Sequence, residues 1–214
     1  MSTVECHASV ALYYATRDGQ SRRIAEYIAS RLAEAGTAAA AQDSALAQIA
    51  PMDMAKDLAT DLATELAGAS VVVLVAAVRY GRHLPEADRL LAVYQSLDTP
   101  PPLALASVNL TARKPLKTTV AGNAYLRKLI ARHCLAPAVA TAFAGRLDYR
   151  RYRFTDRQII RFIMLLTRGP TDPNTCIEYT SWQAVDEFVA RIIELARRPQ
   201  SVSDDQARRE NNVS

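Results

Sequence analysis

The sequence of 214 residues predicts an α/β domain built on a doubly wound parallel sheet. Apolar segments of strand length alternate with helical patterns about five times, which is typical of such a sheet. Most of these segments show little polar alternation, as expected for strands that helices cover on both faces. Short polar residues gather in loops after the strands, where open α/β sheets bind ligands.

The expected strands are short and apolar. The clearest four are Val10–Ala15, Val71–Ala77, Leu103–Asn109 and Ala138–Gly145. A weaker strand is expected near Thr37–Gln42, where a run of alanines leaves the type of element ambiguous. The carboxyl ends of the strands then place three loops at the ligand-binding edge: Thr16–Ser21, Val78–His83 and the segment after Asn109.

The first helix is expected directly after the first loop. Ile24, Ile28 and Leu32 repeat every four residues, which is the spacing of a buried helical stripe. Gly36 supplies a C-terminal stop for this helix. Pro85 suits the first turn of another helix, because proline is favoured at that position.

Two further helices and a tail complete the order of elements. Tyr125–His133 has a short helical pattern, and Thr180 with Gln183 forms a capping-box pattern ahead of the last helix. Residues 199–214 are polar and charged without apolar periodicity, which predicts a disordered tail. The sequence therefore predicts one domain over residues 8–198.

The composition excludes several classes of protein. The sequence lacks the run of about 20 apolar residues that a transmembrane helix needs, and its start lacks a signal-peptide pattern. A cytoplasmic protein is therefore expected. Neither a disulfide framework nor a metal site is expected, because the three cysteines and three histidines are scattered: Cys6, Cys134, Cys176, His7, His83 and His133.

Positive charge is concentrated in one region of the sequence. From Thr111 to Arg168 there are thirteen Lys or Arg residues against two acids, Asp148 and Asp156, a net charge of +11. The whole chain carries a net charge of only +4. This asymmetry indicates an anionic partner.

The loop Thr16–Ser21 has the composition of a phosphate site. It lies before a helix N-terminus, whose unpaired N–H groups and dipole favour a phosphate. Thr16 and Ser21 add hydroxyls, Gln20 adds an amide, and Gly19 allows close approach of the backbone. Neither the P-loop nor the dinucleotide glycine pattern is present, so a mononucleotide is favoured. The alternative is a turn whose hydroxyls only cap the helix.

Longer segments resemble a known family in the same order along the chain. They are "TRDGQSRRIAEYIASRLAEAG", "VRYGRHL", "SVNLTARKP", "NAYLRK", "AGRLDYRRYRFTDRQIIRFIM" and "YTSWQAVDEFVARI". The first resembles the phosphate loop of flavodoxin-like FMN proteins, and the set is most similar to the menaquinone-dependent protoporphyrinogen oxidases of bacterial haem synthesis. The resemblance covers Ala8 to Leu195 and implies a flavodoxin-like five-stranded parallel sheet of order 2-1-3-4-5, with a basic insertion at about residues 146–180 before the last helix.

The resemblance also implies roles for particular residues. The FMN phosphate would be bound by Thr16, Arg17, Asp18, Gly19, Gln20 and Ser21, although the charge of Arg17 could instead face solvent or substrate. The isoalloxazine ring would lie along Val78, Arg79, Tyr80 and Gly81. Ser107 and Asn109 would contact the flavin edge. The alternatives are a packing role for Tyr80 and a turn role for Asn109.

One departure from flavodoxins concerns the second aromatic residue that usually covers the flavin. The segment after Asn109 offers none. Either one face of the ring is left for substrate, or an aromatic of the insertion covers it, the candidates being Tyr149, Tyr152 and Phe154. Both options suit an enzyme better than an electron carrier.

The insertion combines arginines with aromatic residues. Thr155 and Gln158 form a capping-box pattern that opens a helix from about Asp156 to Thr167. A narrow basic stripe on a broad apolar helix suits a membrane surface, and the alternative is a core-packing helix with a solvated basic face. Substrate or membrane binding is expected for Arg150, Arg151, Arg153, Arg157 and Arg161. Nucleic acid is disfavoured, because no nucleic-acid module is recognisable.

The resemblance implies an FMN-dependent oxidation of protoporphyrinogen IX to protoporphyrin IX, with electrons passed to menaquinone or another quinone. The enzyme would act at an anionic membrane, as a peripheral protein on the inner face of the cell membrane. No metal is expected, and His83 is a weak candidate for the proton acceptor. The alternatives are an NAD(P)H:quinone reductase, an electron-transfer flavodoxin and a flavin-free binding module.

Overall fold

The computed structural model describes residues 9–35, 58–149, 154–166 and 169–197. A parallel sheet forms its centre, with the strands in the order β1-β2-β4-β5. These strands are β1 (Val10–Ala15), β2 (Val71–Arg79), β4 (Leu103–Val108) and β5 (Val139–Phe143). The predicted α/β doubly wound sheet is confirmed, and the predicted strand near Thr37–Gln42 lies outside the described residues.

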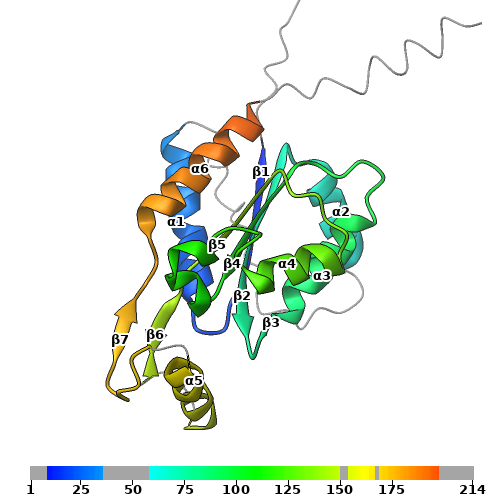
Figure 1. The fold of residues 1–214 in the computed structure, drawn as a ribbon. Coiled ribbons are helices and arrows are strands. Elements are labelled where there is room, and N and C mark those ends of the chain that lie inside the picture. The colour runs from blue at the N-terminus through cyan, green and yellow to red at the C-terminus, as the bar shows by residue number, and fades with distance from the viewer. Residues whose placement is uncertain (1–8, 36–57, 150–153, 167–168, 198–214) are drawn as a thin grey trace, which may run out of the picture.

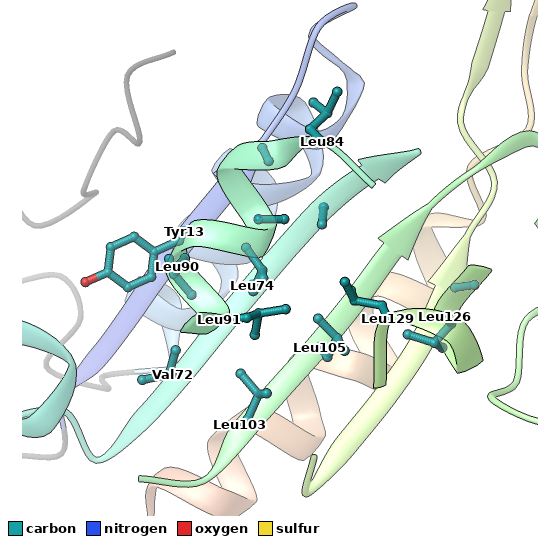
Figure 2. Close-up of a cluster of buried hydrophobic side chains, with 14 of the residues drawn as sticks. Tyr13, Val72, Leu74, Leu84, Leu90, Leu91, Leu103, Leu105, Leu126 and Leu129 are labelled. Carbon is teal, nitrogen blue, oxygen red and sulfur yellow. The ribbon is translucent and has the colours of Figure 1, made fainter. Parts of the chain in front are cut away.

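Helices cover both faces of this sheet (Figure 1). On one face lie α1 (Gln20–Glu34) and α6 (Trp182–Ala196). On the other lie α2 (Leu58–Ala67), α3 (Pro85–Gln95) and α4 (Ala124–Arg132). Each strand supplies both cores, since alternate side chains point to opposite faces. In β2, for example, Val72 and Leu74 pack with α3 and α4 (Figure 2), whereas Val73 packs with α1 and α6.

The first helix follows its predicted pattern. Ile24, Ile28 and Leu32 are fully buried against the sheet. The helix begins at Gln20, after Gly19 takes up a left-handed conformation with φ of 86°. This conformation costs a residue with a side chain about 1 kcal/mol or more, so glycine allows the sharp turn from strand to helix.

The predicted capping box of the last helix is wrong by one residue. The N-cap of α6 is Ser181, whose hydroxyl accepts a hydrogen bond from the Ala184 N–H. Thr180 is buried instead and donates to the Ala144 carbonyl at 2.8 Å. It also accepts a hydrogen bond of 2.9 Å from the Gln20 amide, which joins this segment to the start of α1.

The insertion forms a small unit of its own beside the sheet (Figure 1). It contains β6 (Arg146–Asp148), α5 (Phe154–Leu166) and β7 (Cys176–Glu178), and β6 pairs antiparallel with β7. Leu147, Tyr149 and Met164 are buried together as its core. Because α5 begins at Phe154, the expected cap Thr155 lies inside the helix, and that capping prediction is also wrong.

Candidate functional site

A pocket opens at the carboxyl ends of the parallel strands, where the sequence predicts a ligand. The predicted residues that line it are Thr16, Asp18, Gln20, Ser21, Val78, Arg79, Tyr80, Gly81 and Asn109. Residues that sequence analysis did not assign also line it, notably Tyr125, Arg146, Ile159 and Ile160. Three segments far apart in the sequence therefore meet in one cavity with the middle of α5.

The first loop presents donors at the start of α1. Its turn is fixed by the Gly19 N–H, which donates to Thr16 Oγ1 at 3.0 Å, and no side chain caps the helix at Gly19. Ser21 lines the pocket and is 1% exposed, and its Oγ has no hydrogen-bond partner among the described residues. A buried hydroxyl without a partner at a helix N-terminus fits a bound phosphate.

Arg17 lies in the same loop but reaches away toward α3. Its Nη2 is 2.6 Å from Glu86 Oε1, and Glu86 is buried in the first turn of that helix. The guanidinium is therefore committed to a carboxylate, and the lining residues of this loop are neutral apart from Asp18. The predicted contact of Arg17 with the cofactor stays a prediction.

The second loop is a tight turn between β2 and β3 (Arg82–His83). Tyr80 and Gly81 have φ of 50° and 78°, so both are left-handed, as a type I′ hairpin turn requires. That conformation is unusual for a bulky side chain, and such outliers cluster at functional sites. Tyr80 is 61% exposed, so the alternative of a packing aromatic does not describe it.

An ion pair joins the two loops. Arg79 Nη1 is 3.1 Å from Asp18 Oδ1, and the Arg79 guanidinium also lies 5.3 Å from the centre of the Tyr80 ring. The ion pair thus connects the loop Thr16–Ser21 to the turn at Tyr80 and Gly81. Its two opposite charges also offset each other in the pocket wall.

A second aromatic residue is present at the pocket, although sequence analysis found none after Asn109. It is Tyr125, in the first turn of α4. Asn123 caps this helix by accepting hydrogen bonds from the N–H groups of Tyr125 and Leu126, which brings the ring to the pocket. Tyr149, by contrast, is fully buried in the insertion, so it does not cover the site. The side chains of Tyr152 and Phe154 lie outside the described residues.

A buried polar network supports the pocket floor. Asn109 Nδ2 donates to Ser107 Oγ at 3.0 Å, and Ser107 Oγ lies 2.8 Å from His83 Nε2. Asn109 Oδ1 accepts from the Ala112 N–H and from Asn123 Nδ2. Asn109 therefore fills the turn role, and it lines the pocket as well. Ser107 is fully buried beneath it.

His83 belongs to this network and is 7% exposed. Burial lowers the pKa of its imidazole to about 4, so the ring is neutral at neutral pH and a weak base. The charged groups that act on it, Asp88 and Arg132, oppose each other and have smaller effects than burial. Its role as a proton acceptor stays a prediction.

The low pKa of His83 predicts a pH-dependent stability. Between pH 6.5 and about pH 4 the unfolded imidazole binds a proton and the folded one does not, so the free energy of unfolding should fall as the pH falls. In denaturant titrations across this range, the wild type should lose roughly 3 kcal/mol more than a His83→Gln variant. Parallel pH profiles for the two proteins would contradict this expectation.

The insertion supplies the remaining wall of the pocket. Ile159 and Ile160 of α5 line it, while Ile160 and Met164 pack on the insertion core. The outer side of α5 leaves three large apolar side chains exposed, at 45%, 62% and 65%: Ile159, Phe162 and Leu165. The alternative of a purely core-packing helix therefore does not describe α5, since part of its apolar surface lies in solvent.

The predicted arginines of the insertion lie in different surroundings. Arg161 donates from Nε to the Thr171 carbonyl at 2.9 Å and so ties α5 to the following segment. Arg157 is half-buried on α5, and Arg150, Arg151 and Arg153 lie outside the described residues. In the part of the chain that the structure describes, no group of His, Cys, Asp or Glu is placed to hold a metal ion.

The chain is similar to several known proteins. Residues 11–174 match the model of the flavodoxin domain family. The protoporphyrinogen IX dehydrogenase (quinone) of Escherichia coli K12 is 34% identical over 188 residues, which is 88% of this chain and 96% of that protein. The protein of the same name from Leishmania major is 35% identical, over 86% of this chain and 74% of its own. A solved structure, the metal-soaked Flv1 flavodiiron core from Synechocystis sp. PCC6803, is 12% identical over 66% of this chain and 32% of its own, with a TM-score of 0.45.

Proposed function

This chain belongs to the flavodoxin-domain family of the protoporphyrinogen IX dehydrogenases (quinone), and from that membership we propose that it oxidises protoporphyrinogen IX to protoporphyrin IX. The cofactor we propose is FMN, and the electron acceptor is menaquinone or another membrane quinone. The main support for the proposal is the pocket, which is lined by the loop Thr16–Ser21, by Tyr80 and Tyr125, and by α5.

The residues of the pocket fit FMN. The buried Ser21 hydroxyl and the uncapped start of α1 would hold the phosphate. Tyr80 and Tyr125 would border the isoalloxazine ring, where aromatic side chains pack well. When bound, FMN supplies the hydride and electron transfer, and the protein supplies position and electrostatics. Ile159 and Ile160 would shield the reacting end of the pocket from water.

The outer side of α5 supports a role at the membrane. Its exposed apolar side chains, Ile159, Phe162 and Leu165, recur every three residues and so share one side of the helix. Ile159 also lines the pocket, so the apolar surface continues from solvent to the proposed active site. Among the described residues, no helix is both long and apolar enough to cross a bilayer. From the exposed apolar side of α5 we propose that the protein lies on an anionic membrane through this helix and meets its quinone there.

The test is anaerobic oxidation of protoporphyrinogen IX by the FMN-loaded protein. Porphyrin fluorescence should rise with a menaquinone analogue present, and the apoprotein should give only the background rate. Without the quinone, the yield should stop at about one third of the amount of bound FMN, because the oxidation removes six electrons and each FMN accepts two. Absence of porphyrin under every condition would overturn the proposal. Rapid quinone reduction with NAD(P)H as the donor, without porphyrinogen oxidation, would favour the reductase alternative.

A further inference from the structure

We propose that Arg146 is the residue that recognises a carboxylate of the substrate, an inference that rests on the proposed function. Arg146 was not among the arginines that sequence analysis assigned to substrate or membrane. It is the first residue of β6 and lines the pocket directly after the sheet ends at β5. Its position is therefore set by both the domain and the insertion.

The guanidinium of Arg146 is oriented by the antiparallel pair of strands β6 and β7. Its Nη2 donates to Asp148 Oδ2 at 3.2 Å and to Cys176 Sγ at 3.0 Å. The Asp148 side chain is 10% exposed, whereas that of Arg146 is 37% exposed. The β6–β7 pair thus fixes the guanidinium while leaving part of it accessible. A fixed guanidinium loses little entropy when it binds a planar carboxylate.

The charges around the pocket favour an anion at Arg146. Among the described residues, the charged side chains that line the pocket are Asp18, Arg79 and Arg146, and the first two form an ion pair with each other. Asp148 neutralises part of the charge of Arg146 but does not line the pocket. The cross-strand neighbour Glu178 already accepts hydrogen bonds from Gln20 and Arg23. A ligand in the pocket therefore meets Arg146 rather than its counter-charges.

The rest of the lining defines the kind of ligand. The pocket that Arg146 lines also has apolar and aromatic surface, from Ile159, Ile160, Tyr80 and Tyr125. Such a site suits a large apolar molecule with a carboxylate arm. A porphyrinogen with propionate side chains has this character. The competing anion is the FMN phosphate, because Gln20 at the start of α1 donates to Glu178 of β7, the strand that pairs with β6.

The experiment compares binding of protoporphyrin IX and its dimethyl ester to the FMN-loaded protein, by fluorescence titration. The wild type should bind the free acid at least tenfold more tightly than the ester. Arg146→Gln should weaken binding of the acid by a similar factor and leave ester binding unchanged. Arg146→Lys should restore part of the preference. Lys128→Gln, which removes an exposed charge of the basic region outside the pocket, should behave as the wild type.

Several outcomes would overturn the inference. The first is a wild type that binds the acid and the ester equally well. The second is an equal loss of affinity for acid and ester in Arg146→Gln, and the third is an Arg146→Gln variant that still prefers the acid. A fourth is a loss of FMN affinity in Arg146→Gln without a matching loss of riboflavin affinity, which would assign Arg146 to the phosphate instead. The proposed function fails separately: a wild type that binds the acid through Arg146 but oxidises no porphyrinogen would refute the oxidase alone.

Discussion

Replacing both Thr16 and Ser21 by alanine is expected to lower the affinity for FMN by roughly a hundredfold and to change the affinity for riboflavin by less than about threefold. Ser21 offers a buried hydroxyl without a partner in the described structure, and Thr16 fixes the turn through the Gly19 N–H. A hydrogen bond to a charged group contributes about 1.5–3 kcal/mol, so the loss should be confined to the flavin that carries a phosphate.

This difference between the two flavins is measured by titrating the apoprotein and following quenching of flavin fluorescence. Ser30→Ala, an α1 variant outside the pocket, is the matched control and should bind both flavins as the wild type does. An equal loss of FMN and riboflavin affinity would show that the double variant damages the fold of the loop rather than a phosphate site. Unchanged FMN affinity would refute the assignment of the loop.

The double change Phe162→Gln and Leu165→Gln is expected to reduce binding to anionic phospholipid vesicles by about a hundredfold. Each of these side chains is more than half exposed on α5, at 62% and 65%. Moving one such side chain into an apolar environment contributes about 1.5–3 kcal/mol. Neither residue lines the pocket, so FMN affinity should be unchanged.

Vesicle co-sedimentation measures this effect, with phosphatidylcholine vesicles alongside mixed vesicles that contain an anionic lipid. Leu116→Gln is the control, because it removes an exposed apolar side chain outside α5, in the short 3-10 helix Pro115–Lys117. It should retain most of the binding. Equal vesicle binding by the wild type and the α5 double variant would show that this helix is not the membrane contact. Loss with Leu116→Gln alone would place the contact elsewhere.

The sheet and the first helix could be predicted because their signals are local. A run such as Val71–Ala76 has no polar residue, and every one of its side chains is buried. The Ile24, Ile28 and Leu32 stripe is likewise set by helical spacing alone. The capping box of the last helix failed because Thr180 donates instead to the buried Ala144 carbonyl. A pattern of four residues does not reveal such a competitor.

The sequence predicts which loops form the site, but not which side chains contact one another there. The partners of Arg17 and Asp18 lie 69 and 61 residues away in the sequence, so only the fold brings each pair together. Tyr125 was not predicted because Asn123, the N-cap of its helix, lies fourteen residues beyond Asn109, and only the fold brings the two together. The opposite surroundings of Tyr80 and Tyr149, one exposed and one fully buried, are also tertiary properties.

The ion pair between Arg17 and Glu86 affects how FMN binding should depend on ionic strength. Arg17 Nη2 lies 2.6 Å from Glu86 Oε1, so its charge is already paired. The loop would therefore bind a phosphate through backbone N–H groups and hydroxyls rather than through a mobile positive charge. Dissolved salt screens exposed charges over about 10 Å at 0.1 M, but it has little effect on short hydrogen bonds to buried dipoles. The protein should therefore retain FMN in concentrated salt, even under conditions that detach it from an anionic membrane.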